Sequence, residues 1–336
     1  MAKITAGFGS SHSIMLVSQR EDWQYGFREI DTKNPNYFDS LGNQLTYAEL
    51  LKCAPENSDD LVTPEIMGQL YDRVQIDMNS IRERIAKSNL DCLIIIGDDQ
   101  TELFRMTNMP SIAIYYGQTI RNAKAELLDS DGWYKRARMA RQETQLDREY
   151  PVDSQLGEWL ISQLASRNFD ISAMNGLERG LFEGHAFSFI HKRYLQDSVD
   201  GINMSDLPIL PIILNTFDPP NQPTPKRCIE LGLQLRELIA NYPSQKRIGI
   251  LASGGLSHFV VDEKLDQGII AAIKNNDLDW LSNLPIEQLK AGSSEIRNWL
   301  VAIAALQDLK LDWISYTPAY RSPALSGTGL CFAHWV

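Results

Sequence analysis

Three short apolar segments of this chain each run directly into a polar turn that contains glycine. They are residues 4–8, 91–96 and 247–252, and the turns that follow them read GSSH, GDDQ and SGGLSH. Short apolar runs bounded by such turns are typical of buried strands. Between these segments apolar residues recur at helical spacing, most clearly at 64–88 and 227–242. This alternation predicts an α/β fold, a layered sheet with helices on both faces.

Further elements are expected wherever apolar residues recur with strand or helix spacing. They are strands at 111–116 and 207–214, helices at 152–166, around 264–275 and around 294–307, and a short helix at 46–52 capped by Thr46. No linker divides the chain, so we expect one domain across residues 1–336. Within it we expect a lid-like insertion at about 19–80 and a surface excursion at about 118–150.

The charge and composition exclude several classes of protein. A formal net charge of −11 argues against a nucleic-acid partner, because such proteins usually present a basic face. No stretch approaches the ~18 apolar residues of a membrane span, and the first residues show no secretion signal. We therefore expect a cytoplasmic protein. Its four cysteines are widely spaced, which favours reduced and mostly buried thiols.

The polar turns are the candidate functional positions, because ligands of open α/β sheets bind at the carboxyl ends of the strands. His12, the 98–100 cluster and His258 are therefore expected to converge on one site, which would lie at these strand ends. Each has a structural alternative: a lone histidine after a strand is often structural, and a GDD turn is often a helix N-cap. Glu295 is either a metal ligand or a carboxylate that the helix dipole favours in a first turn.

Other familiar catalytic motifs are absent from the sequence. The first strand is not followed by GxGxxG, and the chain has no phosphate-binding GxxxxGK loop. It also has no GxSxG nucleophile elbow and no HExxH zinc motif.

Taken together, the motifs resemble the protocatechuate 4,5-dioxygenase β-subunit family, which is part of the class III extradiol dioxygenases. The similarity is greatest to its longer branch, which includes 3-O-methylgallate and gallate enzymes. The matching stretches keep the family's order along nearly the whole chain. They are ITAGFGSSH (4–12), DCLIIIGDDQTELF (91–104), MPSIAIYYG (109–117), EGHAF (183–187), LPIILNTFDPP (210–220), PKRCIELG (225–232), SGGLSH (253–258) and AGSSEIRNWL (291–300).

The resemblance implies a role for each matching residue. His12 and Glu295 match iron ligands, and His258 matches the histidine that acts as general acid and base. His185 matches a histidine that lines the substrate pocket behind the ligands. The resemblance thus implies extradiol cleavage of a catechol-type diol, such as gallate, 3-O-methylgallate or protocatechuate, by non-haem Fe(II) and dioxygen.

One departure from the family pattern affects the metal site. The family's second iron-ligand histidine is replaced here by Gln100. We expect Gln100 or an adjacent carboxylate, Asp98 or Asp99, to supply the missing ligand, with His185 as a further alternative. A site this rich in oxygen suits Fe(II), with Mn(II) or Mg(II) as alternatives.

The resemblance also implies a substrate-binding segment at 316–329. There we expect Arg321, with Tyr320 and Ser326, to bind substrate, Arg321 by pairing with a carboxylate; an exposed surface arginine is the alternative. The 19–80 insertion either covers the pocket with its tyrosines or is an ordinary surface excursion. Relatives suggest a homodimer, and some use a small partner subunit.

Two rival functions stay open at the level of sequence. One is another metal-dependent enzyme on the same scaffold, which the replacement at Gln100 suggests. The other is a binding or scaffold protein that kept the fold and lost its metal. Retention of His12, His258 and Glu295 in family positions argues against the second.

Overall fold

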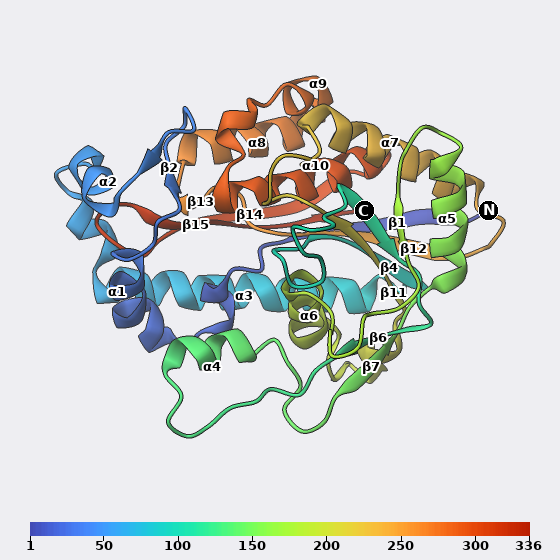
Figure 1. The fold of residues 1–336 in the computed structure, drawn as a ribbon, viewed down its shortest axis with the longest axis horizontal. Helices are drawn as coiled ribbons and strands as arrows, with labels where there is room; N and C mark the ends of the chain where they lie inside the picture. Colours follow the sequence, from blue (N-terminus) through green and yellow to red (C-terminus); the bar gives the residue numbers. More distant parts are fainter.

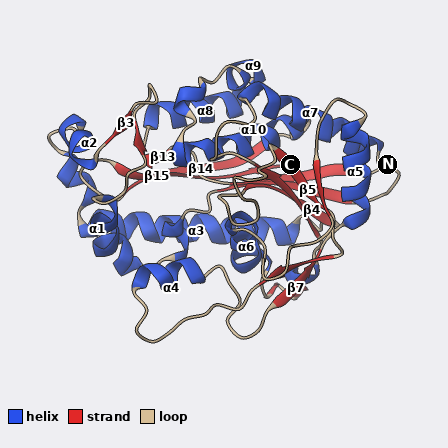
Figure 2. Ribbon diagram, viewed as in Figure 1, coloured by secondary structure: helices blue, strands red, loops and turns tan.

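The computed structural model describes residues 1–336, and its centre is a mixed sheet of nine strands. Their order is β13-β15-β1-β12-β4-β11-β5-β8, and β14 pairs with β15 (Figures 1 and 2). The strands are β1 (Lys3–Ser10), β4 (Cys92–Asp98), β5 (Ile112–Tyr115), β8 (Ser172–Met174), β11 (Ile209–Leu214), β12 (Arg247–Ser253), β13 (His258–Val260), β14 (Leu311–Tyr320) and β15 (Ser326–Trp335).

Four parallel strands, β1, β12, β4 and β11, form the middle of the sheet. Their register aligns the strand ends that carry the polar turns. Ser10 pairs with Ser253, and Asp98 pairs with Leu214. All residues of β4 and β11 are buried, which explains their continuous apolar sequences.

Helices cover both faces of this sheet, so the predicted fold class is confirmed (Figure 1). One face carries α7 to α10, and the other carries the long helix α3 with α4 and α6 (Figure 1). The helices are α1 (Phe27–Asp31), α2 (Tyr47–Cys53), α3 (Pro64–Lys87), α4 (Trp133–Met139), α5 (Ser154–Ala165), α6 (His185–Ile190), α7 (Pro225–Asn241), α8 (Glu263–Asn275), α9 (Leu278–Ser282) and α10 (Ile296–Ala305).

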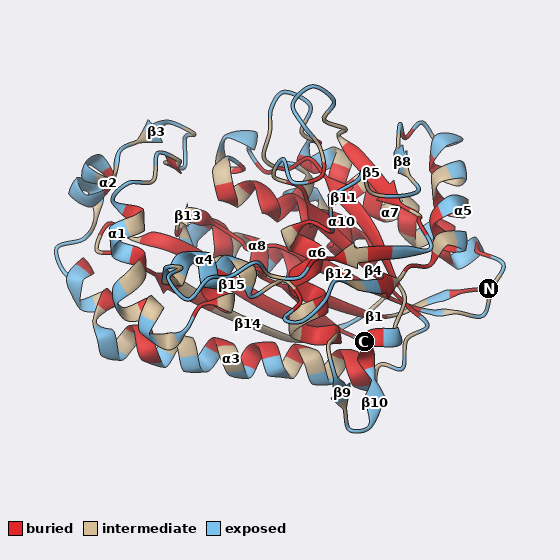
Figure 3. Cartoon of the chain, turned by 60° about the horizontal axis from the view of Figure 1, so that its bottom comes forward, coloured by how far each residue is buried: buried red, intermediate tan, exposed pale blue.

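The hydrophobic core lies between the sheet and these two helix layers (Figure 3). Helix α10 is buried along its whole length. Its Trp299 packs against Gly9 of β1 and donates a hydrogen bond of 2.8 Å to the backbone oxygen of Gly254. The core therefore fixes the turn after β12, where SGGLSH begins.

Most predicted elements of the main sheet and its helices are present within a few residues of their predicted bounds. Thr46 caps α2, with a capping box that Glu49 completes. The sequence interpretation missed the C-terminal hairpin of β14 and β15. Proline and glycine interrupt its strand pattern, yet Pro318 is tolerated because β14 is an edge strand that pairs only with β15.

The two predicted excursions contain secondary structure of their own. The 118–150 segment holds α4 between two short paired strands, β6 (Thr119–Asn122) and β7 (Arg148–Pro151). The 19–80 segment holds α1, α2, the first part of α3 and the small ribbon of β2 (Tyr37–Phe38) and β3 (Gln44–Leu45).

None of the helices is both long enough and apolar enough to cross a membrane. All four cysteines are free thiols; Cys53 is exposed and the other three are buried.

Candidate metal centre

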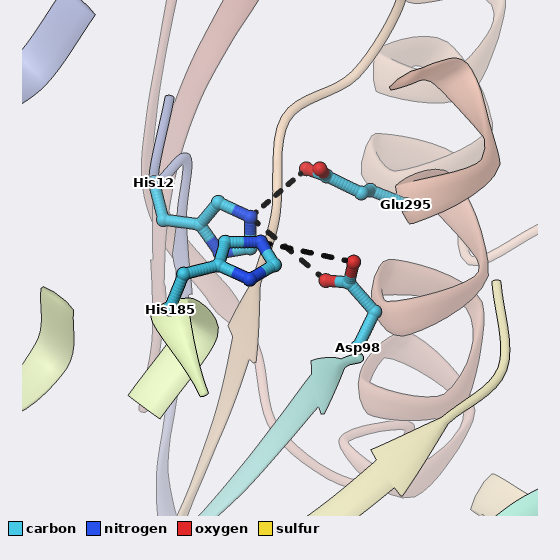
Figure 4. A group of neighbouring side chains, drawn as sticks. All are labelled: His12, Asp98, His185 and Glu295. Atoms are coloured by element: carbon cyan, nitrogen blue, oxygen red, sulfur yellow. Dashed lines mark ion pairs between the residues drawn. The ribbon is translucent and has the colours of Figure 1, made fainter. Parts of the chain in front are cut away.

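Four side chains from distant parts of the sequence meet at the carboxyl ends of the parallel strands. His12 follows β1, Asp98 ends β4, His185 begins α6 and Glu295 directly precedes α10. One potential ligand atom from each lies within 4.8 Å of those of the other three (Figure 4). The expectation that the turns after β1 and β4 converge is therefore confirmed.

The cluster presents two imidazole nitrogens to two carboxylates. Nε2 of His12 lies 3.2 Å from Oε2 of Glu295 and 3.8 Å from Oδ1 of Asp98. Nε2 of His185 lies 3.8 Å from Oδ2 of Asp98. Nε2 of His12 is buried and has no hydrogen-bond partner, which is costly unless a bound cation satisfies it. Two nitrogens and two oxygens with an orphaned lone pair fit a divalent metal such as Fe(II) or Mn(II).

The ring orientation of His12 is set by Ser253, the last residue of β12. Oγ of Ser253 donates a hydrogen bond of 2.8 Å to the backbone oxygen of Ala186. Because its only proton is used there, the Ser253 hydroxyl can only accept the hydrogen bond, of 2.9 Å, that joins it to Nδ1 of His12. His12 is therefore held as the Nδ1–H tautomer, which leaves the Nε2 lone pair free for a metal.

His185 and His258 are held as the same tautomer by oxygen acceptors. Nδ1 of His185 lies 2.6 Å from Oε2 of Glu102, and Nδ1 of His258 lies 2.9 Å from the backbone oxygen of Leu256. An oxygen that only accepts requires Nδ1 to carry the proton. Each Nε2 then faces a carboxylate of the cluster. Nε2 of His185 faces Asp98, and Nε2 of His258 lies 3.2 Å from Oε1 of Glu295.

Hydrogen-bond donors hold the two carboxylates in place. Nδ2 of Asn298 lies 3.1 Å from Oδ1 of Asp98, and the backbone N–H of Gly255 donates to Oε2 of Glu295 at 2.8 Å. Gln100 bridges the two carboxylates, because its Nε2 lies 3.2 Å from Oδ2 of Asp98 and 3.3 Å from Oε1 of Glu295. Such hydrogen bonds fix ligand geometry before a metal binds.

The electrostatics of the cluster match a cation site. Burial, with the nearby Glu295 carboxylate, raises the pKa of Asp98. Burial also acts to raise the pKa of Glu295, but His12 and His258 outweigh it and hold that pKa well below its usual range. Burial acts to lower the pKa of His185, yet Glu102 raises it to about 9. A divalent metal would replace the proton of His185 and neutralise the carboxylates.

The structure places the three polar residues of the GDDQ turn differently. Asp98 points into the cluster and Gln100 donates to its carboxylates. Asp99 does not reach the centre: its carboxylate accepts hydrogen bonds from the backbone amides of Leu103 and Phe104 at 2.8 and 3.2 Å. Successive side chains at the end of a strand point to opposite sides, which separates Asp99 from Asp98.

The three expected substrate-binding residues are engaged with acidic residues of the chain. Arg321 is buried and pairs with Asp31, with Nη2 2.7 Å from Oδ1. Oγ of Ser326 donates to the same carboxylate at 2.5 Å, and the Tyr320 hydroxyl bonds to Glu263. The alternative of an exposed Arg321 is thus wrong, and its charge is already balanced within the fold.

A cavity of about 240 Å³ opens onto the cluster. It is lined by His12, His185 and Glu295, together with Gln100 and His258. A substrate in this cavity would contact the predicted general base and the metal ligands at once. Of the predicted site residues, Asp98, Asp99, Tyr320 and Ser326 do not line this cavity, and the others do.

Several residues of the site were missed by sequence reasoning. Ser253, Glu102 and Asn298 orient the ligands, and Arg138 and Arg141 line the cavity. Ser253 and Glu102 lie in motifs that the sequence displayed, but nothing in those motifs indicates which side chain will meet a histidine. The arginines lie in the segment that was expected to be a surface excursion.

Comparison with known families agrees with this geometry. The model for the catalytic LigB subunit of aromatic ring-opening dioxygenase matches residues 53–330, which include Asp98, His185, His258 and Glu295. His12 precedes the match and reaches the centre because β1 pairs with β12. The family is metal-dependent, in accord with the cluster. The chain belongs to the LigB family of catalytic subunits of aromatic ring-opening dioxygenases.

Proposed function

We propose that the protein is an extradiol dioxygenase that opens a catechol-type aromatic ring with non-haem Fe(II) and dioxygen. Gallate, 3-O-methylgallate and protocatechuate are the candidate substrates. The observation that carries the proposal is the convergence of His12, His185 and Glu295 beside a cavity that His258 also lines. Membership of the ring-opening family supports it.

We assign the metal to His12, His185 and Glu295. Two histidines and one carboxylate form the ligand set of non-haem Fe(II) oxygenases. In this assignment His185 supplies the histidine that the Gln100 position lacks, and Asp98 adds an oxygen beside the triad. Fe(II) bound there would supply the Lewis-acid and redox chemistry for the reaction of the diol with dioxygen. Mn(II) suits the same donors and is the alternative metal.

We assign proton transfer to His258. Its Nδ1–H is held by the backbone oxygen of Leu256, so Nε2 is the atom free to exchange a proton. Burial acts to lower the pKa of His258, but Glu295 outweighs it and raises that pKa. As a base it would take a proton from a diol hydroxyl, and as an acid it would return one to the opened product. Both atoms of dioxygen enter the product, so no external reductant is required.

The experiment combines metal content with oxygen uptake. Anaerobically purified protein is expected to bind about one Fe(II) per chain. It should then consume one dioxygen per diol opened on at least one of gallate, 3-O-methylgallate and protocatechuate. Glu295→Gln should lose both properties. Glu287→Gln is the matched control, because Glu287 is exposed and lies outside the cavity.

Other outcomes separate the rival functions. Bound metal without oxygen uptake on any diol would favour a different metal-dependent reaction at the same site. Absence of metal after anaerobic loading would contradict the catalytic proposal and favour a binding protein. The cytoplasmic location stays a prediction from the sequence, and the homodimer and the small partner subunit stay predictions of the resemblance.

A further inference from the structure

Three arginines line the cavity beside the metal cluster, and they differ in how their charges are balanced. They are Arg138, Arg141 and Arg321. Arg321 forms a two-point ion pair with Asp31, through Nη2 at 2.7 Å and Nε at 3.1 Å. Arg138 and Arg141 form no ion pair, and their guanidinium groups form no hydrogen bond; the backbone oxygen of Arg141 accepts one from Asn122. Two cationic groups thus face the cavity without a partner.

The backbone that carries Arg141 is nevertheless held firmly. Nδ2 of the buried Asn122 donates to the backbone oxygen of Arg141 at 3.0 Å. Two residues later, the amide of Glu143 donates to the backbone oxygen of Ala123 at 2.8 Å. The Glu143 side chain accepts hydrogen bonds from Tyr150 at 2.6 Å and Lys192 at 3.0 Å. Arg141 is therefore positioned by the fold while its guanidinium is left free.

The helix before Arg141 is also anchored to the body of the protein. Trp133, the first residue of α4, packs edge-to-face on Phe27 with ring centroids 5.0 Å apart. This contact joins α4 to the 19–80 segment. A cation held on anchored backbone is preorganised for a ligand, because little freedom is lost when the ligand binds.

The charges around the cavity favour an anion. A divalent metal would be balanced by Asp98 and Glu295, and Arg321 is balanced by Asp31. Of the carboxylates that line this cavity, only Glu102 is left to offset the two remaining arginines, so one positive charge is left over there. Burial lowers the pKa of Arg141, which is the expected effect on a cation that lacks a close partner.

We infer that Arg141, assisted by Arg138, selects aromatic diols that carry a carboxylate group. The inference rests on the proposed ring-opening function and names the residues that would bind the carboxylate that all three candidate substrates carry. Guanidinium groups bind carboxylates in two-point geometry, and hydrogen bonds to charged groups are the strong ones. A second cavity of about 270 Å³ shares Glu102, Arg138, Arg141 and His185 with the first. It offers room for a carboxylate on the ring or on a short arm.

The test compares acids with their uncharged carboxamides on the anaerobic Fe(II) holoenzyme. Protocatechuate and its carboxamide place the group on the ring, and dihydrocaffeate and its carboxamide place it on a two-carbon arm. Calorimetry gives the dissociation constants without turnover, and oxygen uptake gives kcat/KM. At least one acid should bind about tenfold or more tightly than its amide, as expected for a charged hydrogen bond.

The variants locate this preference at Arg141. Arg141→Gln should bring the acid-to-amide ratio near one, Arg141→Lys should keep part of it, and Arg138→Gln should reduce it less. Arg136→Gln is the matched control, because Arg136 lies on the same helix but does not line the cavity. It should leave the ratio unchanged.

Either of two results would overturn the inference: a wild-type ratio near one for both pairs, or a ratio that Arg141→Gln does not alter. Failure of the proposed function is distinguishable, because it appears as missing oxygen uptake while the binding ratio persists. Ring opening of acids and amides with equal kcat/KM and equal affinity would leave the proposed function intact and remove only the role of Arg141.

Discussion

One carboxylate oxygen of Glu102 holds both the ring and the backbone of His185. Oε2 of Glu102 lies 2.6 Å from Nδ1 of the ring and 2.9 Å from the backbone nitrogen. The two residues are separated by 83 positions in the sequence. This contact aims Nε2 of His185 at the metal cluster from the first turn of α6.

Replacing Glu102 should weaken metal binding. Because such partners orient the ligand and raise its basicity, Glu102→Ala is expected to lower Fe(II) or Mn(II) affinity by roughly 10- to 100-fold, and Glu102→Gln by less. Calorimetry under anaerobic conditions measures the affinity. Glu178→Gln, an exposed change in the loop before α6, should leave it unchanged. Equal affinities for Glu102→Ala and wild type would contradict the role of Glu102.

Replacing Glu102 by Gln should also lower the pKa of His185 in the metal-free protein. Glu102 raises the pKa of His185 to about 9 against the lowering effect of burial. Loss of the Glu102 charge should therefore move the His185 pKa downward, toward or below its ordinary value of about 6.5. NMR titration of the ring resonances measures the shift. An unchanged pKa in Glu102→Gln would show that another group holds the proton.

Ser253→Ala should weaken metal binding through the orientation of His12. The variant removes the acceptor for Nδ1–H, so that the His12 ring can turn and either nitrogen can carry the proton. We expect metal affinity to fall about tenfold or more, because partners of ligating histidines typically contribute this much. Ser282→Ala, at a half-buried position that does not line the cavity, is the control. A fall of equal size in both variants would argue against this specific role.

Removing Arg321 should affect folding more than substrate selection. Arg321→Ala leaves the buried Asp31 carboxylate without its cation, and loss of one partner of a buried pair costs about 3–5 kcal/mol. Denaturant unfolding measures the loss. The double variant Asp31→Leu with Arg321→Met should recover much of it, because no uncompensated charge remains. A stable Arg321→Ala protein with a selective loss for carboxylated diols would instead favour the direct binding role.

Asp266 should make stability depend on pH. Burial raises its pKa to about 6, although Ser257 and Tyr316 donate hydrogen bonds to it. Because this folded-state pKa exceeds the unfolded value of about 3.9, the contribution of Asp266 is fully present below about pH 4. It is lost as pH rises through about 6. The free energy of unfolding of wild type relative to Asp266→Asn should therefore fall between pH 4 and 7. A constant difference would show that the carboxyl group titrates normally.

The sequence predicted the metal-centre region because the strands and the polar turns that end them are local signals. Apolar runs identify β1, β4 and β12, and parallel strands carry their following turns to one edge of a sheet. His12 and Asp98 meet for this reason, although they are 86 positions apart in the sequence. The polar residues of these turns could also be identified from the sequence, because they follow each strand directly.

The partners of individual side chains could not be predicted from local sequence patterns. Asp31 and Arg321 are 290 positions apart, and no periodicity relates them. Arg141 lies in a segment without a clear pattern, yet the paired strands β6 and β7 and the contact of Trp133 with Phe27 carry it to the cavity.

Local sequence patterns therefore predicted the layered sheet, the edge at which the site forms and the turn residues His12 and Asp98 that meet there. They did so because hydrophobic periodicity and turn residues act over a few positions. Long-range packing places His185 rather than Asp99 in the cluster, neutralises Arg321 with Asp31 and leaves Arg141 without an ion pair. Ion pairs and ligand sets depend on which distant segments pack together, and short-range patterns do not specify that packing.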